Sequence, residues 1–295
     1  MAIQNSRPLS HPVRSDTTTR LSHRATALSK KVAGPAICGA ANIVSRLKRI
    51  GHKGADSIRP GNTLESFEAA VTAGVEMIEL DVLRPRAEFS DGSDWRQAPA
   101  GPVLPGAPPL LVAHDWGDAA RREPLTLGEV LDAFGRPPLD GVEIDCDLKI
   151  AGREDEVVGA LRERGLMDRA SISTMEVSSL TVLGHLDQGI PLGWTVPKVT
   201  RDWNSMRWAR PLVLAGLVSL RSRLPGMVRR QAPGLGVRSM WAYDPVITGR
   251  LVRACHETGV ELVAWTIDEL ERMRELARLG VDGICTNDPR LFAKL

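Results

Sequence analysis

Short apolar runs alternate with longer amphipathic stretches from Arg49 to the end of the chain. The short runs are rich in Val, Ile and Leu, as buried strands are, whereas the longer stretches have the apolar spacing of one helix face. This alternation predicts a parallel sheet joined by crossover helices. The candidate strands are Ile50–Gly54, Glu76–Val82, Leu110–His114, Val142–Leu148, Ala170–Thr174, Leu192–Val196, Ser239–Tyr243, Leu262–Ile267 and Gly283–Thr286.

One of these nine segments is not preceded by a helical pattern. Between Val82 and Leu110 the sequence has six prolines instead, and a parallel crossover needs a helix or a comparable connection. We therefore expect Leu110–His114 to be a return strand within a long insertion after the second strand. The other eight strands, each followed by a helical pattern, predict a (β/α)₈ TIM barrel.

Two of the predicted helices have clear end signals. Asn62-Thr63 is expected to cap the helix that carries Phe67, with acidic residues in its first turns. Asp268 is expected to open the last long helix, and Gly280 to end it.

Residues 1–47 differ in composition from the rest of the chain. They are rich in Ser, Thr and Arg, with Asp16 as the only acid and no sustained apolar periodicity. We expect a flexible N-terminal tail over residues 1–47 and a single TIM-barrel domain over residues 48–295, a length that suits one large barrel.

Composition excludes some classes of partner and compartment. A formal net charge of +2 gives no reason to expect nucleic acid as a partner. The four cysteines lack metal-ligand spacing, so we expect buried free thiols in a reducing compartment, which favours a cytoplasmic location. No apolar run approaches the roughly 20 residues that are needed to cross a bilayer.

Residues that carry chemistry stand where the predicted strands end, which is where barrels of this type place their functional groups. They are His52, Lys53, Glu79, Asp81, His114, Asp145, Asp147, Lys149 and Trp265. Side chains alternate along a strand, so Glu79 and Asp81 share one face. Burying this many charges would be costly in a purely structural core, so the pattern favours a functional site.

The residue types indicate metal-assisted phosphoryl chemistry. Carboxylates are hard oxygen ligands that suit Mg²⁺ or Ca²⁺ better than zinc. The cation would neutralise phosphate oxygens, and the histidines would transfer protons.

In order and position, these motifs resemble those of the glycerophosphodiester phosphodiesterase family, which has a TIM barrel like that of phosphatidylinositol phosphodiesterases. The motifs are His52-Lys53-Gly54, Gly61-Asn62-Thr63, Glu79-Leu80-Asp81, His114-Asp115 and Asp147-Leu148-Lys149. The run from Trp265 to Ile267 and the ending from Gly280 to Pro289 are also similar to the family's. The resemblance covers residues 49–295.

The resemblance implies roles for individual residues. It implies one divalent cation, Mg²⁺ or Ca²⁺, held by Glu79, Asp81 and Asp147, with Lys53 and Lys149 on the substrate phosphate. It also implies His52 and His114 as the acid/base pair: His52 would take a proton from the nucleophile and His114 would give one to the departing alkoxide, although these two roles can be exchanged.

The implied activity is that of a phosphoric diester hydrolase of lipid and glycerol metabolism. It would cleave glycerophosphodiesters to glycerol 3-phosphate and an alcohol. Lysophospholipase D-type cleavage of lysophospholipids is an alternative. A degenerate family member without turnover is a third hypothesis, motivated by two departures from the family's motifs.

Those departures are at Lys53 and Gly61. Lys53 stands where the family has arginine, so the charge is kept and the bidentate fork is lost. Gly61 stands where the family has glutamate. The insertion between Asp81 and His114 is also longer than the family's, and we expect it to reshape substrate entry.

Several assignments stay open on the sequence alone. Asp145 could replace Asp147 as the third ligand after a two-residue shift in register. Glu143 lies deeper in the strand and is expected to be a buried partner of a basic residue. Trp265 either lines the mouth or packs. His185 and His256 lie on predicted helices and receive no role.

One long segment raises the question of membrane contact. Val196–Val237 is longer than a barrel crossover needs and carries tryptophans, an apolar run and seven arginines against one acid. One interpretation is an ordinary barrel helix with a basic outer face. The other is peripheral membrane contact through residues 200–230, with arginines against anionic lipid.

Overall fold

Eight parallel strands close into a barrel, as the sequence predicts. The computed structural model describes residues 47–102, 105–198 and 210–295. The barrel strands are β1 (Lys48–His52), β2 (Met77–Leu83), β4 (Glu143–Leu148), β5 (Ala170–Thr174), β6 (Leu192–Val196), β7 (Ser239–Tyr243), β8 (Glu261–Trp265) and β9 (Gly283–Thr286). Closure is complete because β1 pairs with both β2 and β9. The fold is therefore a (β/α)₈ TIM barrel.

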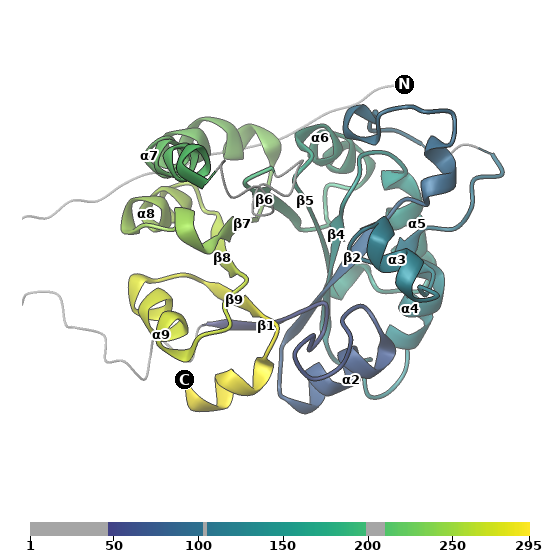
Figure 1. Cartoon of the computed structure of the whole chain (residues 1–295), viewed down its shortest axis with the longest axis horizontal. Helices are drawn as coiled ribbons and strands as arrows, with labels where there is room; N and C mark the ends of the chain where they lie inside the picture. The colour runs from purple at the N-terminus through teal and green to yellow at the C-terminus, as the bar shows by residue number, and fades with distance from the viewer. Residues whose placement is uncertain (1–46, 103–104, 199–209) are drawn as a thin grey trace, which may run out of the picture. The chain divides into compact units, whose positions relative to one another are not determined.

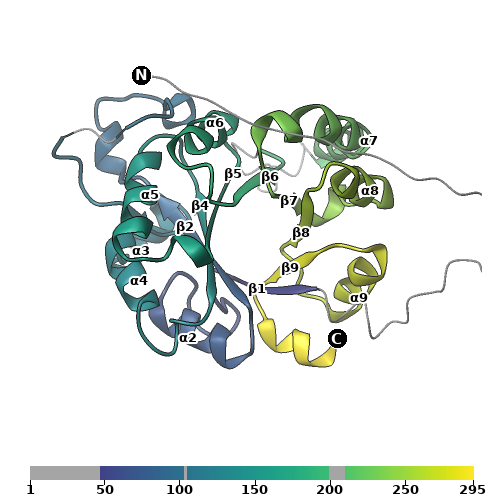
Figure 2. The same ribbon diagram turned by 180° about the vertical axis from the view of Figure 1, so that it is seen from behind.

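Helices surround these strands on the outside (Figure 1), and Figure 2 shows the same ring from behind. They are α2 (Leu64–Thr72), α4 (Leu127–Phe134), α5 (Glu154–Glu163), α6 (Val177–Leu186), α7 (Arg210–Leu235), α8 (Gly249–Glu257) and α9 (Leu270–Leu279). After β9 the chain forms a short 3₁₀ helix, η7 (Pro289–Lys294), in place of an eighth α-helix.

The segment after β2 is an insertion with a return strand, as predicted. It contains two 3₁₀ turns, η1 (Arg86–Phe89) and η2 (Trp95–Gln97), then β3 (Leu111–Val112) and α3 (Trp116–Arg121). β3 is shorter than predicted and pairs antiparallel with the end of β2. The insertion therefore lies at the carboxyl end of a barrel strand.

Buried ion pairs hold this insertion against the barrel. Arg153, with only 3% of its side chain exposed, bonds Glu88 of η1 at 2.5 Å and the carbonyl of Pro108 at 2.7 Å. Glu88 also accepts from Arg84 at 2.7 Å. Because these charges are buried and paired, the insertion has a fixed position on the barrel.

The ends of α2 and α9 can be compared with the capping residues predicted from the sequence. The hydroxyl of Thr63 caps α2 by accepting from the Ser66 N–H. Gly280, at φ 92°, ends α9 in the left-handed conformation as predicted. Asp268 does not open α9, since the helix begins at Leu270 with Glu269 as its N-cap. The Asp268 carboxylate instead accepts hydrogen bonds from Asn287.

The core of the described residues has three parts: one between strands and helices, one inside the barrel, and one of Leu83, Ala113 and Ile150 against which the insertion packs. Phe67, Phe134 and Leu180 belong to the outer part. The inner part contains Ile50, Met77, Trp241, Val263 and Cys285. Apolar side chains thus fill much of the barrel interior. Cys146, Cys255 and Cys285 are buried free thiols, as expected.

α7 follows the stretch 199–209, which lies outside the described residues. Its second half packs on the core through Leu224, Val228 and Ala232, as an ordinary barrel helix does. In its first half, Leu217 and Leu220 are half-buried, and Val218 is 67% exposed. No helix in the described ranges has the length and hydropathy of a membrane span. Of the predicted tail, residues 1–47, residues 1–46 also lie outside the described residues, whereas Leu47 is buried in the core.

Candidate active site

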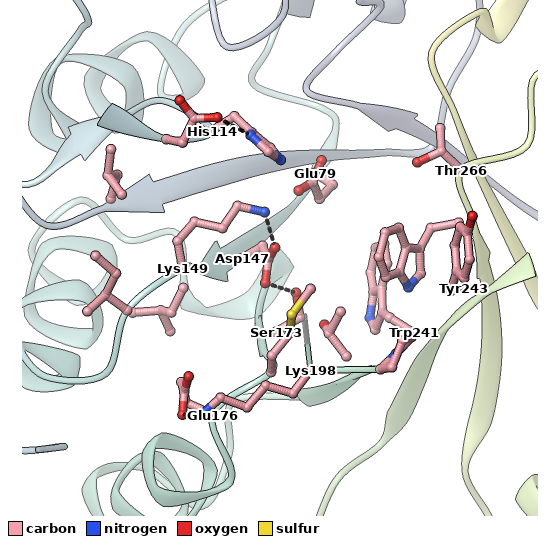
Figure 3. Close-up of a pocket in the computed structure, with 18 of the residues that line it drawn as sticks. Glu79, His114, Asp147, Lys149, Ser173, Glu176, Lys198, Trp241, Tyr243 and Thr266 are labelled. Carbon is pink, nitrogen blue, oxygen red and sulfur yellow. Dashed lines mark hydrogen bonds and ion pairs between the residues drawn. The ribbon is translucent and has the colours of Figure 1, made fainter. Parts of the chain in front are cut away.

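Three buried carboxylates meet at the mouth of the barrel. Glu79 and Asp81 come from β2 and Asp147 comes from β4, and one oxygen of each lies within 4.8 Å of the other two. The parallel register sets Asp81 beside Asp147. Figure 3 shows Glu79 and Asp147 on one wall of the cavity, with Lys149 between His114 and Asp147. The structure therefore brings together the three carboxylates that the resemblance implied as metal ligands.

The loop after β1 holds two of these carboxylates in place. The backbone N–H of Lys53 donates to Glu79 Oε2 at 2.9 Å. The Asn62 side chain donates to Asp81 Oδ2 at 2.6 Å and accepts from the Asp81 N–H at 3.1 Å. Lys53 and Asn62 both adopt positive φ, 52° and 59°, a conformation that is uncommon outside glycine. The His-Lys-Gly and Asn-Thr motifs thus orient acids on the neighbouring strand.

Lys149 is the counter-ion of this cluster. Its ammonium lies in ion-pair contact with both Asp81 and Asp147. Burial and the charge of Asp81 raise the pKa of Glu79 well above its ordinary value. Burial is the largest single influence on Asp81 and acts to raise its pKa, but the nearby charges of Lys149, His114 and His52 together outweigh it, and that pKa is lowered.

The site fits a divalent cation. Asp81 Oδ1 is fully buried and accepts no hydrogen bond from the described residues, although it lies in ion-pair contact with Lys149. Three acids share the ammonium of Lys149, and the charge of Asp81 contributes to the raised pKa of Glu79, a repulsion that a bound cation would relieve. Buried charges of one sign need an opposite charge nearby, and carboxylate oxygens suit Mg²⁺ or Ca²⁺.

Asp145 lies apart from this cluster. It is fully buried, and it accepts from Ser171 Oγ at 2.6 Å and from Ser173 Oγ at 2.5 Å. Burial raises its pKa to about 7, with the two hydroxyls opposing the shift. Because its oxygens are occupied by serines deeper in the barrel, the geometry favours Asp147 over Asp145 as a ligand.

His52 is held by a chain of side chains that determines its tautomer. Asn287 donates its amide to Asp268 Oδ2 at 2.7 Å, so its Oδ1 faces His52 Nδ1 at 2.7 Å and accepts from it. The other ring nitrogen, Nε2, then has its lone pair free and lies 4.0 Å from Glu79. Burial lowers the pKa of His52 to about 4. A neutral imidazole in this orientation can accept a proton.

His114 belongs to the insertion and is far more open. Half of its side chain is exposed, at 52%, and Nδ1 lies 3.0 Å from Asp115. Asp115 also caps α3 by accepting from the Asp118 N–H. His114 lines the same cavity as His52, Glu79 and Asp147, so the structure brings both predicted histidines to one site.

Lys53 is directed away from that cavity. Its ammonium pairs with Asp56 at 2.7 Å and lines a neighbouring hollow with Gly61 and Arg122. The N–H of Gly61 donates to the same Asp56 carboxylate at 2.7 Å. A Cβ atom at Gly61 would stand 2.7 Å from Asp56 and 2.8 Å from Lys53. Asp56 therefore occupies the space into which a side chain at Gly61 would extend.

The cavity itself has a volume of about 530 Å³. Besides charged groups, it is lined by aromatic and aliphatic side chains from both the barrel and the insertion: Leu83, Trp95, Trp116, Ile150, Leu217, Trp241, Tyr243 and Trp265. Trp95 and Trp116 contact each other edge to face at 5.8 Å. The insertion thus forms part of the cavity lining.

The remaining predicted residues have clear positions. Glu143 pairs with Lys48 at 2.8 Å, so the basic partner was predicted correctly, but its side chain is 44% exposed and not buried. Glu143 lies at the first residue of its strand, where the lower end of the barrel is open to solvent. Trp265 lines the cavity and also packs on Tyr243 at 5.5 Å. His185 and His256 lie on α6 and α8.

Four residues that position the site were not recognised as such from the sequence. They are Asn62, Asp56, Asp268 and Asn287. Asn62 and Asn287 stand in the quoted motifs, next to residues with assigned roles. Apart from their proximity to those motifs, nothing in the sequence indicated a positioning role for Asp56 or Asp268. Asp268 contacts Asn287, which is distant in sequence, and the contact of Asp56 with Lys53 depends on the turn between them.

Comparisons with known proteins point to the same family as the motifs at the strand ends. The model of the glycerophosphoryl diester phosphodiesterase family matches residues 52–85 and 138–291. The gap between these segments contains the insertion and His114. A probable glycerophosphodiester phosphodiesterase 2 of Mycobacterium tuberculosis is 28% identical over 249 residues, 80% of this chain and 85% of that protein.

Two further relatives extend the comparison. A glycerophosphodiester phosphodiesterase of Arabidopsis thaliana is 32% identical over 246 residues, 64% of this chain and 73% of that protein. A phosphodiesterase of Oleispira antarctica, solved in complex with the product sn-glycerol-3-phosphate, has a TM-score of 0.53 at 18% identity. The superposition covers 85% of this chain and 98% of that one, which shows a common fold.

Proposed function

The chain belongs to the glycerophosphoryl diester phosphodiesterase family, and we propose that it hydrolyses glycerophosphodiesters to glycerol 3-phosphate and an alcohol. The observation that carries this proposal is the group of Glu79, Asp81 and Asp147 beside a neutral His52. Membership of this family supplies the reaction class. That the phosphate stays on the glycerol rests on the product bound in the Oleispira antarctica phosphodiesterase.

We propose that the three carboxylates hold one divalent cation. A cation there would neutralise phosphate oxygens and stabilise the charge that develops as the phosphorus–oxygen bond breaks. Oxygen ligands alone favour Mg²⁺ or Ca²⁺. Lys149, already between two of the ligands, adds a fixed positive charge on the phosphate side of the site.

The two histidines divide the proton transfers in this proposal. His52 takes a proton at Nε2 from the nucleophile, either water or the neighbouring glycerol hydroxyl, because Nδ1 is bound to Asn287. His114 lies on the insertion at the cavity rim and gives a proton to the departing alkoxide. Lys53 acts through its backbone N–H on Glu79 in this structure, since its ammonium is bound by Asp56.

Lysophospholipids form a second candidate substrate class. Trp95, Trp116 and Leu217 give the cavity an apolar side that a glycerophosphodiester would not fill. An acyl chain placed there would bury apolar surface at roughly 25 cal/mol per Å². Cleavage would then be of lysophospholipase D type, with the same residues at the phosphorus. Peripheral membrane contact near α7 would accompany such a substrate.

A product-resolved assay tests the proposal. Glycerophosphocholine, glycerophosphoethanolamine and lysophosphatidylcholine are offered separately with Mg²⁺ or Ca²⁺, and the released alcohol and phosphate ester are identified. Chelation of divalent ions should abolish turnover, and His52→Ala should lower it roughly 10²- to 10⁴-fold. Asp147→Asn should behave like chelation.

Glu143→Gln is the matched control for Asp147→Asn, because it changes an acid on the same strand at the opposite end of the barrel. It should retain wild-type turnover. Full activity in excess chelator, or in His52→Ala, would overturn the proposed mechanism. Absence of turnover on all three substrates in the folded, metal-loaded wild type would support a degenerate family member.

A further inference from the structure

One wall of the cavity carries polar atoms that have no use in the chemistry described above. The register places Thr195 of β6 beside Trp241 of β7, and Tyr243 of β7 beside Trp265 of β8. All four line the cavity. Figure 3 shows Trp241 and Tyr243 across the cavity from Asp147 and Lys149. We refer to Thr195, Tyr243 and Trp265 as the β6–β8 wall.

Within the part of the chain that the structure describes, two atoms of this wall are buried without a hydrogen-bond partner. They are Thr195 Oγ1, on a side chain that is 5% exposed, and Trp265 Nε1. Neighbouring groups of the same kinds are satisfied internally. The Trp241 indole donates to Ser239 Oγ at 3.1 Å, and the Thr174 hydroxyl donates to the Leu148 carbonyl at 2.9 Å. Buried polar groups are nearly always paired, so the two exceptions on a cavity wall indicate a ligand that supplies the missing partners.

The chemistry of the wall selects the kind of ligand. An indole N–H only donates, whereas a threonine hydroxyl both donates and accepts. A ligand hydroxyl can partner either group. The rings of Tyr243 and Trp265, 5.5 Å apart, offer apolar surface against which the carbon atoms of such a ligand can pack. Glu176, a carboxylate of the cavity lining, is bound to Lys198 at 2.6 Å, so it is not free to recognise a cationic head group.

We propose that the β6–β8 wall is a polyol subsite, in which Thr195 and Trp265 bind hydroxyl groups of the substrate while its phosphate faces the carboxylates. This inference rests on the proposed function, because it assigns the position of one end of a glycerophosphodiester. Thr195 and Trp265 are then specificity-determining residues. The hydroxyls belong either to the glycerol moiety or to a polyol head group. These two possibilities predict different changes in KM when the wall is altered.

Steady-state kinetics on two substrates separate these sources. Glycerophosphocholine has hydroxyls only on its glycerol, and glycerophosphoglycerol has them on both sides of the phosphate. Thr195→Val removes the hydroxyl with little change in shape, and Thr195→Ser keeps it. Loss of one neutral hydrogen bond should raise KM roughly three- to tenfold, with kcat little changed. Trp265→Phe should have a similar effect.

If KM of Thr195→Val rises on both substrates, the wall binds the glycerol moiety. If KM rises on glycerophosphoglycerol alone, the wall binds the head group. Thr195→Ser should restore KM in either case. Calorimetric titration of glycerol 3-phosphate and of ethyl phosphate provides a test without turnover. If glycerol occupies the wall, Thr195→Val should weaken binding of glycerol 3-phosphate and leave ethyl phosphate unchanged.

Unchanged KM on both substrates and unchanged binding of glycerol 3-phosphate in Thr195→Val and Trp265→Phe would overturn the subsite. So would an equal loss of affinity for ethyl phosphate, because that ligand has no polyol. A wild-type enzyme that turns over neither glycerophosphodiester would instead overturn the proposed function. In that case the comparison of glycerol 3-phosphate with ethyl phosphate decides the subsite alone.

Discussion

At the scale of single residues, the site depends on side chains that orient others. Asn287 is the clearest case, since it joins Asp268 to the Nδ1 atom of His52. Asn287→Ala should lower kcat roughly 10- to 100-fold, as losses of such orienting partners do, because His52 loses its fixed tautomer. KM should change little. The pH dependence of kcat distinguishes this role from a structural one: the apparent pKa of the base should shift in Asn287→Ala, while thermal unfolding should stay close to wild type. An unshifted profile would contradict it.

The space into which a side chain at Gly61 would extend is occupied by neighbouring side chains. A side chain there would meet Asp56 and Lys53 at less than 3.0 Å. Gly61→Glu should therefore lower activity on simple glycerophosphodiesters, although it restores the residue of the family motif. If the overlap with Asp56 is the cause, adding Asp56→Gly to Gly61→Glu should recover part of the loss. An increase in turnover for the single variant would show that the site accommodates a glutamate despite Asp56.

At the scale of elements, α7 combines a packed half with an exposed one. Leu224 and Val228 fix the second half on the core, while Val218, Arg221 and Arg223 of the first half are exposed. If this half contacts anionic lipid, co-sedimentation with phosphatidylglycerol vesicles should decrease with salt and in Arg221→Glu/Arg223→Glu, at about 1 kcal/mol for each arginine. Vesicles of neutral phosphatidylcholine should bind less.

The matched control for the α7 prediction is Arg229→Glu. Arg229 lies on the same helix but in its packed half, where it pairs with Glu257 at 2.7 Å. That variant should still bind vesicles. Equal loss of binding in both variants, or no binding at low salt, would favour an ordinary barrel helix. Trp208, one of the tryptophans of the segment Val196–Val237, lies outside the described residues.

At the scale of the whole molecule, the buried carboxylates should make stability depend on divalent ions. A ligand that binds only the folded state stabilises it by about 2.7 kcal/mol at 100 times its Kd, which is roughly 5–10 °C in Tm for a domain of this size. Scanning calorimetry with Mg²⁺, Ca²⁺ and chelator should show this shift in wild type and in Glu143→Gln. Asp147→Asn should lose most of it. No shift with either ion would remove the metal site, whatever the activity.

The sequence by itself determined the fold and supplied the main candidates for the site. Alternation of strand and helix patterns was sufficient for the barrel, because periodicity and chain length leave few topologies. The prolines before Leu110 identified the return strand, which the structure confirms as β3. Glu79, Asp81 and Asp147 could be named because a barrel strand exposes every second residue to its interior and the family motifs fall at strand ends.

Only the tertiary structure decided which side chains complete the site. Asp145 and Asp147 point to the same face of β4, and the choice between them depended on Ser171 and Ser173 from β5. The tautomer of His52 depends on Asn287, which is 235 positions away in the sequence. The unpaired atoms of Thr195 and Trp265 are visible only once their neighbours are in place. Sequence patterns report which face a residue occupies, whereas hydrogen bonding depends on distances between strands that are remote along the chain.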